Sequence, residues 1–197
     1  YLKQKTGKPY ISCEYMHAMG NSLGDMESYV RLEDQYPGYQ GGFIWDYIDQ
    51  ALYCEKEGKR VLAYGGDFGD RPTDYNYCGN GILYADRRIS PKAACVKALY
   101  SPVLMRIENR QVHIRNRNLF LSTEGYLFRF SIEMEGKILA EEKRALVIMP
   151  GEERTFPFAQ EGTPMEERLR RCTEEACGEI ILQVSMILKR DVLWAEA

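Results

Sequence analysis

Two short apolar segments, separated by one amphipathic segment, constrain the fold of this 197-residue chain more than any other feature. Residues 10–13 read as a buried strand, and residues 40–46 read as a second strand that ends in an aromatic residue and a carboxylate. Strand, helix and strand with short connections form a repeat whose strands run parallel. Because two strands alone do not make a stable parallel sheet, we expect them to belong to a larger one.

The segment between the strands has the start, the face and the end of a helix. Ser22, with Asp25 three residues later, resembles a capping box, so the helix is expected to start there. Pro37 and the glycine after it should end the helix. Three residues form its apolar face: Leu23, Met26 and Val30.

A carboxylate lies where the first strand ends. Glu14 follows the apolar run and precedes a loop of small residues at 18–22. A charge in that position is costly unless it is paired or used. In a parallel β/α barrel this strand end lies on the face that carries catalytic side chains. The residues alone leave open whether Glu14 is functional or a structurally paired carboxylate.

Residues 51–88 are rich in Gly, Asp and Tyr and only weakly periodic, so they read as one long loop. The aromatic residues favour an ordered loop, because disordered segments lack them. The glycines form no nucleotide-binding fingerprint. A short helix is expected over residues 91–100, with Pro91 near its start.

Period-two alternation begins after Ser101-Pro102 and predicts an antiparallel β-sandwich of immunoglobulin-like proportions. The expected strands cover residues 103–107, 112–115, 126–134, 144–148, 180–188 and 192–197, with a helical turn at 165–171. The fold class is therefore α/β plus all-β, with one domain over residues 1–101 and a second over 102–197. Because the last strand has no partner in view, we expect the sandwich to be truncated at its C-terminus.

Composition disfavours several classes of protein. The net charge is −3 and no basic run stands out, which argues against a nucleic-acid or anionic-membrane partner. No apolar run approaches the roughly 20 residues of a membrane helix. Six cysteines without a CxxC pair, together with two distant histidines, argue against a zinc site and for a reducing, cytoplasmic setting. The spacing of Cys172 and Cys177 would allow a disulfide, but two free thiols are the favoured interpretation.

Three blocks of the chain combine characteristic residues in a fixed order. They are residues 11–22, residues 40–50, and residues 64–87, the last of which carries Cys-Gly-Asn-Gly at 78–81. Together they resemble the nucleophile strand, the final barrel strand and the loop beside the galactose pocket in the glycoside hydrolase family 2 β-galactosidases. The resemblance is close over residues 9–100 and weaker through the sandwich.

This resemblance implies a fold and a reaction. The chain would hold the last two β/α units of a (β/α)8 TIM barrel, followed by the sandwich. The complete enzyme would hydrolyse terminal β-D-galactose residues of lactose-type β-galactosides with retention, and Glu14 would be the nucleophile. The family places its acid/base residue in an Asn-Glu pair on an earlier strand, and this chain contains no Asn-Glu. The magnesium ligands are expected upstream as well, so the chain alone is expected to be inactive.

The resemblance also assigns softer roles. His17 would contact the sugar, Trp45 would form the floor of the galactose pocket, and Asn80 would lie beside the substrate. The backbone carbonyl of Tyr77 and the side chain of Asn80 would bind sodium. Without the resemblance, a loop-packing histidine, a core tryptophan and a turn asparagine are the simpler interpretations.

Partners follow from the same interpretation: a β-galactoside, the remainder of the polypeptide, and other copies in a homo-oligomer. The alternative is a non-catalytic carbohydrate-binding or scaffold module, because β-sandwiches host many functions. Glu14 and Trp45 at strand ends argue against it, since a scaffold needs neither.

Overall fold

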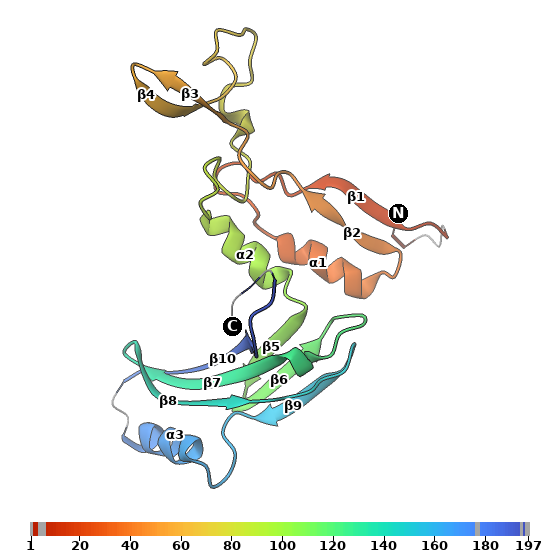
Figure 1. Ribbon diagram of the computed structural model, residues 1–197. Helices are drawn as coiled ribbons and strands as arrows, with labels where there is room; N and C mark the ends of the chain where they lie inside the picture. Colours follow the sequence, from red (N-terminus) through yellow and green to blue (C-terminus); the bar gives the residue numbers. More distant parts are fainter. Residues whose placement is uncertain (1, 4–6, 176–177, 194, 196–197) are drawn as a thin grey trace. The chain divides into compact units, whose positions relative to one another are not determined.

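The computed structural model describes residues 2–3, 7–175, 178–193 and 195 (Figure 1). The chain divides into two compact units, Tyr1–Ser101 and Pro102–Ala197. Among the described residues, no helix has both the length and the apolar character needed to cross a membrane.

The first unit begins with strand β1 (Tyr10–Tyr15), helix α1 (Met26–Gln35) and strand β2 (Tyr39–Ile44). The two strands pair in parallel, as the repeat predicts. The expectation of a buried first strand is wrong, because most of β1 is exposed, including Tyr10 and Ile11. The described sheet has two strands; α1 packs against β2, where Tyr39 is buried, whereas β1 remains largely exposed.

Helix α1 does not begin at the predicted cap. It begins at Met26, after Asp25 in a left-handed conformation (φ 59°), and the Ser22 hydroxyl is buried without a hydrogen-bond partner among the described residues. Leu23 is also left-handed (φ 69°), so the chain turns here and cannot start the helix earlier. The predicted end is confirmed, since α1 ends at Gln35, ahead of Pro37.

The segment expected to be one long loop contains a β-hairpin. Strands β3 (Leu52–Lys56) and β4 (Lys59–Ala63) pair antiparallel around Glu57 and Gly58, both with positive φ. Two positive φ angles suit the right-handed twist of a hairpin, but a Glu-Gly pair is a weak signal beside Asn-Gly. A 3₁₀ turn, η1 (Tyr75–Cys78), and helix α2 (Pro91–Leu99) follow, and α2 agrees with the prediction.

Tyr15 fixes the end of β1 to both helices of the first unit. Its ring packs edge-on against Tyr29 of α1, with centroids 5.3 Å apart, and its hydroxyl lies 2.5 Å from that of Tyr100, directly after α2. Burial and the Tyr100 hydroxyl raise the pKa of Tyr15 above its ordinary value. The core beside it contains Ala18, Leu23, Met26 and Val96. The residue before Tyr15, Glu14, is therefore held on a well-anchored strand end.

The second unit contains two antiparallel three-stranded sheets. One has the order β5 (Val103–Glu108), β6 (Gln111–Asn116), β9 (Glu153–Pro157), and the other β10 (Ile180–Leu188), β7 (Tyr126–Met134), β8 (Lys137–Arg144). Strands β7 and β10 have the predicted bounds and pair along their whole length. Buried residues of both sheets, among them Ile114 and Phe128, form one shared core.

Two predicted strands of the second unit are not present as expected. Strand β8 ends at Arg144, and the residues after it lie against the buried Thr123 of the 3₁₀ turn η2 (Thr123–Gly125). The Thr123 hydroxyl donates to the Leu146 carbonyl (2.6 Å) and accepts from Ile148 N–H (2.9 Å), which replaces a strand partner. Near residues 192–197 the structure gives a single bridge between Val192 and Ala195; residues 194, 196 and 197, like Cys177, lie outside the described residues.

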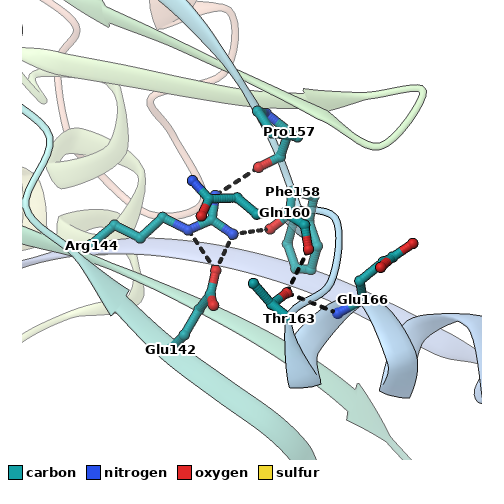
Figure 2. Close-up of polar contacts among 7 residues, drawn as sticks. All are labelled: Glu142, Arg144, Pro157, Phe158, Gln160, Thr163 and Glu166. Atoms are coloured by element: carbon teal, nitrogen blue, oxygen red, sulfur yellow. Dashed lines mark hydrogen bonds and ion pairs between the residues drawn. The ribbon is translucent and has the colours of Figure 1, made fainter.

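A full helix replaces the predicted helical turn. Helix α3 (Pro164–Glu175) begins after Thr163, whose hydroxyl accepts the Glu166 N–H at 3.3 Å (Figure 2). The Glu166 carboxylate accepts the Gly162 N–H at 2.8 Å. This reciprocal capping satisfies donors at the first turn and sets the start of the helix.

Arg144 ties strand β8 to the end of β9 (Figure 2). Its guanidinium pairs with Glu142 and donates to the carbonyls of Pro157 and Phe158, both at 2.6 Å. It also lies over the ring of Phe130, 4.0 Å from the centroid. The guanidinium therefore satisfies two carbonyl groups while it covers one side of the core.

We predict that Phe130→Ala lowers the free energy of unfolding by about 3–5 kcal/mol, because it leaves a cavity under Arg144 and beside Phe158. Phe120→Ala is the matched control, since that side chain is 88% exposed and its loss should cost less than about 0.5 kcal/mol. Urea unfolding of both variants measures the difference, and equal losses would contradict this account of the core.

Candidate active site

The site begins at the edge of the sheet where β1 and β2 both end. Glu14 is the last residue but one of β1, and Trp45 directly follows β2. Parallel strands end at the same edge. Trp45 N–H donates to the Tyr15 carbonyl at 3.1 Å, and its carbonyl accepts the Ala18 N–H at 2.6 Å. The backbone of Trp45 is therefore held beside the strand end that carries Glu14.

The Glu14 side chain is exposed, and no hydrogen bond or ion pair joins its carboxylate to another described residue. The sequence left open whether Glu14 is functional or a structurally paired carboxylate. The described part of the chain offers its carboxylate no partner, which does not support the second interpretation. An exposed carboxylate at a sheet edge is free to contact a ligand.

His17, Tyr77 and Asn80 come together although 63 positions separate the first and the last. The rings of His17 and Tyr77 stack with centroids 4.9 Å apart. The Asn80 amide Nδ2 donates to the Tyr77 carbonyl at 3.1 Å and lies 3.4 Å from His17 Nε2. Because an amide nitrogen only donates, Nε2 of His17 is the acceptor of this contact.

Asn80 is 2% exposed, and its Oδ1 has no hydrogen-bond donor among the described residues. Its backbone carbonyl accepts the Asp46 N–H at 2.7 Å, which places Asn80 beside the segment that follows Trp45. A buried oxygen without a donor is costly unless a cation or a ligand hydroxyl satisfies it. The amide oxygen and the Tyr77 carbonyl are the kind of ligands that a hard cation prefers.

A seam of hydrogen bonds fastens the Asn80 loop to residues 46–50. Asp49 N–H donates to the Leu83 carbonyl and Gln50 N–H to the Cys78 carbonyl, each at 3.0 Å. One tie comes from a side chain: Asp49 Oδ1 accepts the Gly81 N–H at 2.7 Å. Sequence reasoning missed Asp49 and Gly81. Two carboxylates within four residues after Trp45 were the available signal for Asp49; Gly81 gave none.

Helix α2 holds the two loops of the site together. Ser90, just before the helix, donates its hydroxyl to the Ile82 carbonyl at 2.7 Å. Lys92 in the first turn donates its ammonium to the Ala18 carbonyl. Both loops that carry candidate residues are therefore fixed to one helix end. Within the described ranges, no group of three or more His, Cys, Asp and Glu side chains could hold a metal ion.

Comparisons with known proteins divide the chain into two matched regions. Residues 1–105 match the sequence model described as "Glycosyl hydrolases family 2, TIM barrel domain", and residues 112–197 match "Beta-galactosidase, domain 4". A solved structure of Bacteroides uniformis beta-glucuronidase aligns with 91% of this chain and with 22% of its own chain, at 16% sequence identity and a TM-score of 0.30.

Several relatives are named beta-galactosidase. The protein of Halalkalibacterium halodurans is 49% identical over 197 residues, which are all of this chain and 18% of that protein. The protein of Clostridium acetobutylicum is 48% identical over 199 residues, again all of this chain and 21% of that protein. The large subunit from Leuconostoc lactis is 54% identical over 102 residues, 51% of this chain and 16% of that protein. The chain thus spans about a fifth of the length of the relatives it matches.

We predict that Gly81→Ala disrupts the seam, because a Cβ there would lie 2.1 Å from Asp49 N, 2.4 Å from the Ile48 carbonyl carbon and 2.5 Å from the Leu83 carbonyl oxygen. Backbone atoms cannot move aside as a flexible side chain can, so a loss of roughly 1–3 kcal/mol or more is expected. Gly24→Ala, with no atom within 4 Å of its Cβ, is the control. Thermal unfolding and limited proteolysis near residues 77–83 test this, and a Gly81→Ala protein as resistant as the control would contradict it.

Proposed function

The chain belongs to glycosyl hydrolase family 2, and from that membership we propose that the longer polypeptide hydrolyses terminal non-reducing β-D-galactose residues of lactose-type β-galactosides. The observation that carries this proposal is the exposed Glu14 carboxylate at the end of β1, beside Trp45 at the end of the parallel β2. The relatives named beta-galactosidase, about half identical across the whole of this chain, support the choice of substrate.

We propose that β1 with α1 and β2 with α2 are the last two β/α units of an eight-stranded barrel, followed by an immunoglobulin-like sandwich. An apolar groove of about 400 Å³ along β1 and α1 supports the presence of further barrel strands beside β1. Tyr10, Tyr29 and Tyr39 are among the residues that line it. A neighbouring β/α unit would cover these groups.

In the proposed reaction a Glu14 carboxylate oxygen attacks the anomeric carbon of galactose. The bond to the leaving oxygen breaks as a second carboxyl group protonates that oxygen, and a glycosyl ester of Glu14 forms. The second group then removes a proton from water, which attacks the same carbon and frees Glu14 with net retention. This acid/base residue and the magnesium ligands belong to other parts of the polypeptide in our proposal.

Three residues of this chain would orient the sugar. The exposed indole of Trp45 offers an apolar face to the C–H groups of the ring. His17 stacks on Tyr77, which fixes the imidazole beside the Asn80 loop. A sugar hydroxyl that donates to the unpaired Asn80 Oδ1 would satisfy a buried acceptor.

We further propose that sodium binds here through Asn80 Oδ1 and the backbone carbonyl of Tyr77. The residues fit such an ion, because Oδ1 is buried without a donor and the carbonyl lies against the same amide. The bound ion would supply a fixed positive charge for sugar hydroxyls, while the protein residues keep the loop in place.

The complete protein is proposed to be a homo-oligomer in the cytoplasm. The five described cysteines are free thiols, which suits a reducing compartment. Leu119, Phe120 and Leu121 are strongly exposed on a loop held by Asn116, whose Nδ2 donates to the Leu121 carbonyl at 2.8 Å. An ordered apolar surface of this kind supports contact with the rest of the polypeptide or with another copy.

We predict that Glu14→Gln in the complete protein lowers the hydrolysis of nitrophenyl β-galactoside by about 10⁴-fold or more. The amide keeps the shape of the side chain but cannot form the glycosyl ester. Stability should change by less than about 0.5 kcal/mol, because the side chain is exposed. Glu27→Gln, an exposed glutamate of α1, is the control and should keep full turnover. Turnover by Glu14→Gln within tenfold of the parent would remove Glu14 from this role.

Residues 1–197 alone, which lack the acid/base partner, should show no turnover in the same assay.

We predict that Asn80→Ala raises KM and increases the half-saturating sodium concentration roughly 10–100-fold, as expected for an altered metal site. Asn76→Ala, an exposed asparagine of η1, serves as the control and should leave the sodium titration unchanged. Activity measured in sodium chloride against choline chloride at constant ionic strength gives both quantities. An unaltered sodium dependence in Asn80→Ala would mean that Asn80 is a turn residue that does not bind sodium.

A further inference from the structure

The carboxylate of Asp49 lies beside the candidate site and forms a hydrogen bond that has no part in the proposed reaction. Asp49 lies in the segment after β2, and its Oδ1 accepts the Gly81 N–H at 2.7 Å across 32 positions of sequence. Gly81 is the next residue after Asn80. The carboxylate is therefore one peptide group away from the proposed sodium ligand.

The approach of the two backbones leaves little freedom at this point. An ideal Cβ on Gly81 would fall 2.1 Å from Asp49 N and 2.4 Å from the Ile48 carbonyl carbon. The loop therefore packs directly on the chain after Trp45, without an intervening side chain. Because the two backbones are in direct contact, moving the acceptor oxygen of Asp49 by the length of one C–C bond would either displace the Gly81 peptide or break its hydrogen bond.

The remaining ties of the seam are bonds between backbone groups. Asp46 N–H donates to the Asn80 carbonyl at 2.7 Å, and Ile82 N–H donates to the Asp46 carbonyl at 3.1 Å. These bonds fix Asn80 and Ile82 on either side of Gly81, and the Asp49 carboxylate satisfies the N–H between them. Substitution can change this last tie alone, because it is made by a side chain.

We propose that Asp49 is a positioning residue that holds the Asn80–Gly81 peptide, and through it the Asn80 side chain and the Tyr77 carbonyl, in the geometry that binds sodium. This inference rests on the sodium site of the proposed function. Asp49 touches neither substrate nor ion; it acts through the orientation of the loop. The position of its oxygen, rather than its negative charge, is what the role requires.

Two substitutions separate position from charge. Asp49→Asn keeps an oxygen acceptor in the same place without the charge, whereas Asp49→Glu keeps the charge and moves the oxygen by one methylene. Asp67→Glu is the matched control. Asp67 lies between β4 and η1 and also accepts a backbone N–H, from Tyr64 at 3.1 Å, but its other contact is with Lys56.

The experiment measures the sodium-dependent rise in Tm of the complete protein, with choline chloride to keep the ionic strength constant. Asp49→Glu should increase the half-saturating sodium concentration roughly tenfold or more, as for other groups that orient metal ligands, with kcat at saturating sodium retained. Asp49→Asn and Asp67→Glu should stay within about twofold of the parent.

The outcomes are distinguishable. Asp49→Glu titrating like the parent, or Asp49→Asn losing as much sodium affinity as Asp49→Glu, would overturn the positioning role while the parent's sodium response still stands. A parent without any sodium-dependent rise in Tm would refute the sodium site itself, and the role of Asp49 with it.

Discussion

The parallel pairing of β1 with β2 is the interaction on which the candidate site depends. It brings Glu14 and Trp45 to one sheet edge although a whole helix separates them in the sequence. Everything else at the site is attached to that edge: the Asn80 loop bonds to the chain after Trp45, and Lys92 reaches the loop after Glu14. The long segment between residues 50 and 78 does not disturb this arrangement, because the β3–β4 hairpin within it takes no part in the hydrogen bonds that join residues 46–50 to the Asn80 loop.

Local pattern predicted the second unit well wherever one sheet face is buried. Residues 126–134 and 180–188 carry an apolar side chain at every second position, and β7 and β10 have those bounds. Capping was less predictable. Ser22 has the capping spacing but precedes a turn with left-handed residues, whereas Thr163 and Glu166 do cap a helix that the sequence suggested only as a turn. The same residue spacing can serve either structure, and the backbone angles that decide between them are not visible in a residue pattern.

The separate pieces of the site were more predictable than the contacts between them. The resemblance singled out His17, Tyr77 and Asn80, and the structure brings them together; their chemical roles remain proposals. Asp49 and Gly81 were not foreseen, because their importance lies in a close approach between segments 32 positions apart. Buried backbone groups must find partners, but which side chain supplies them depends on tertiary geometry that composition and periodicity do not contain.

The central claim is that Glu14 forms the covalent bond to the sugar. A galactoside with fluorine at carbon 2 and a good leaving group should inactivate the complete protein, because the fluorine slows release of the glycosyl ester more than it prevents its formation. Peptide mass spectrometry after digestion should then locate one fluorogalactosyl group on Glu14. A label on another carboxylate, or full inactivation with Glu14 unmodified, would contradict the account.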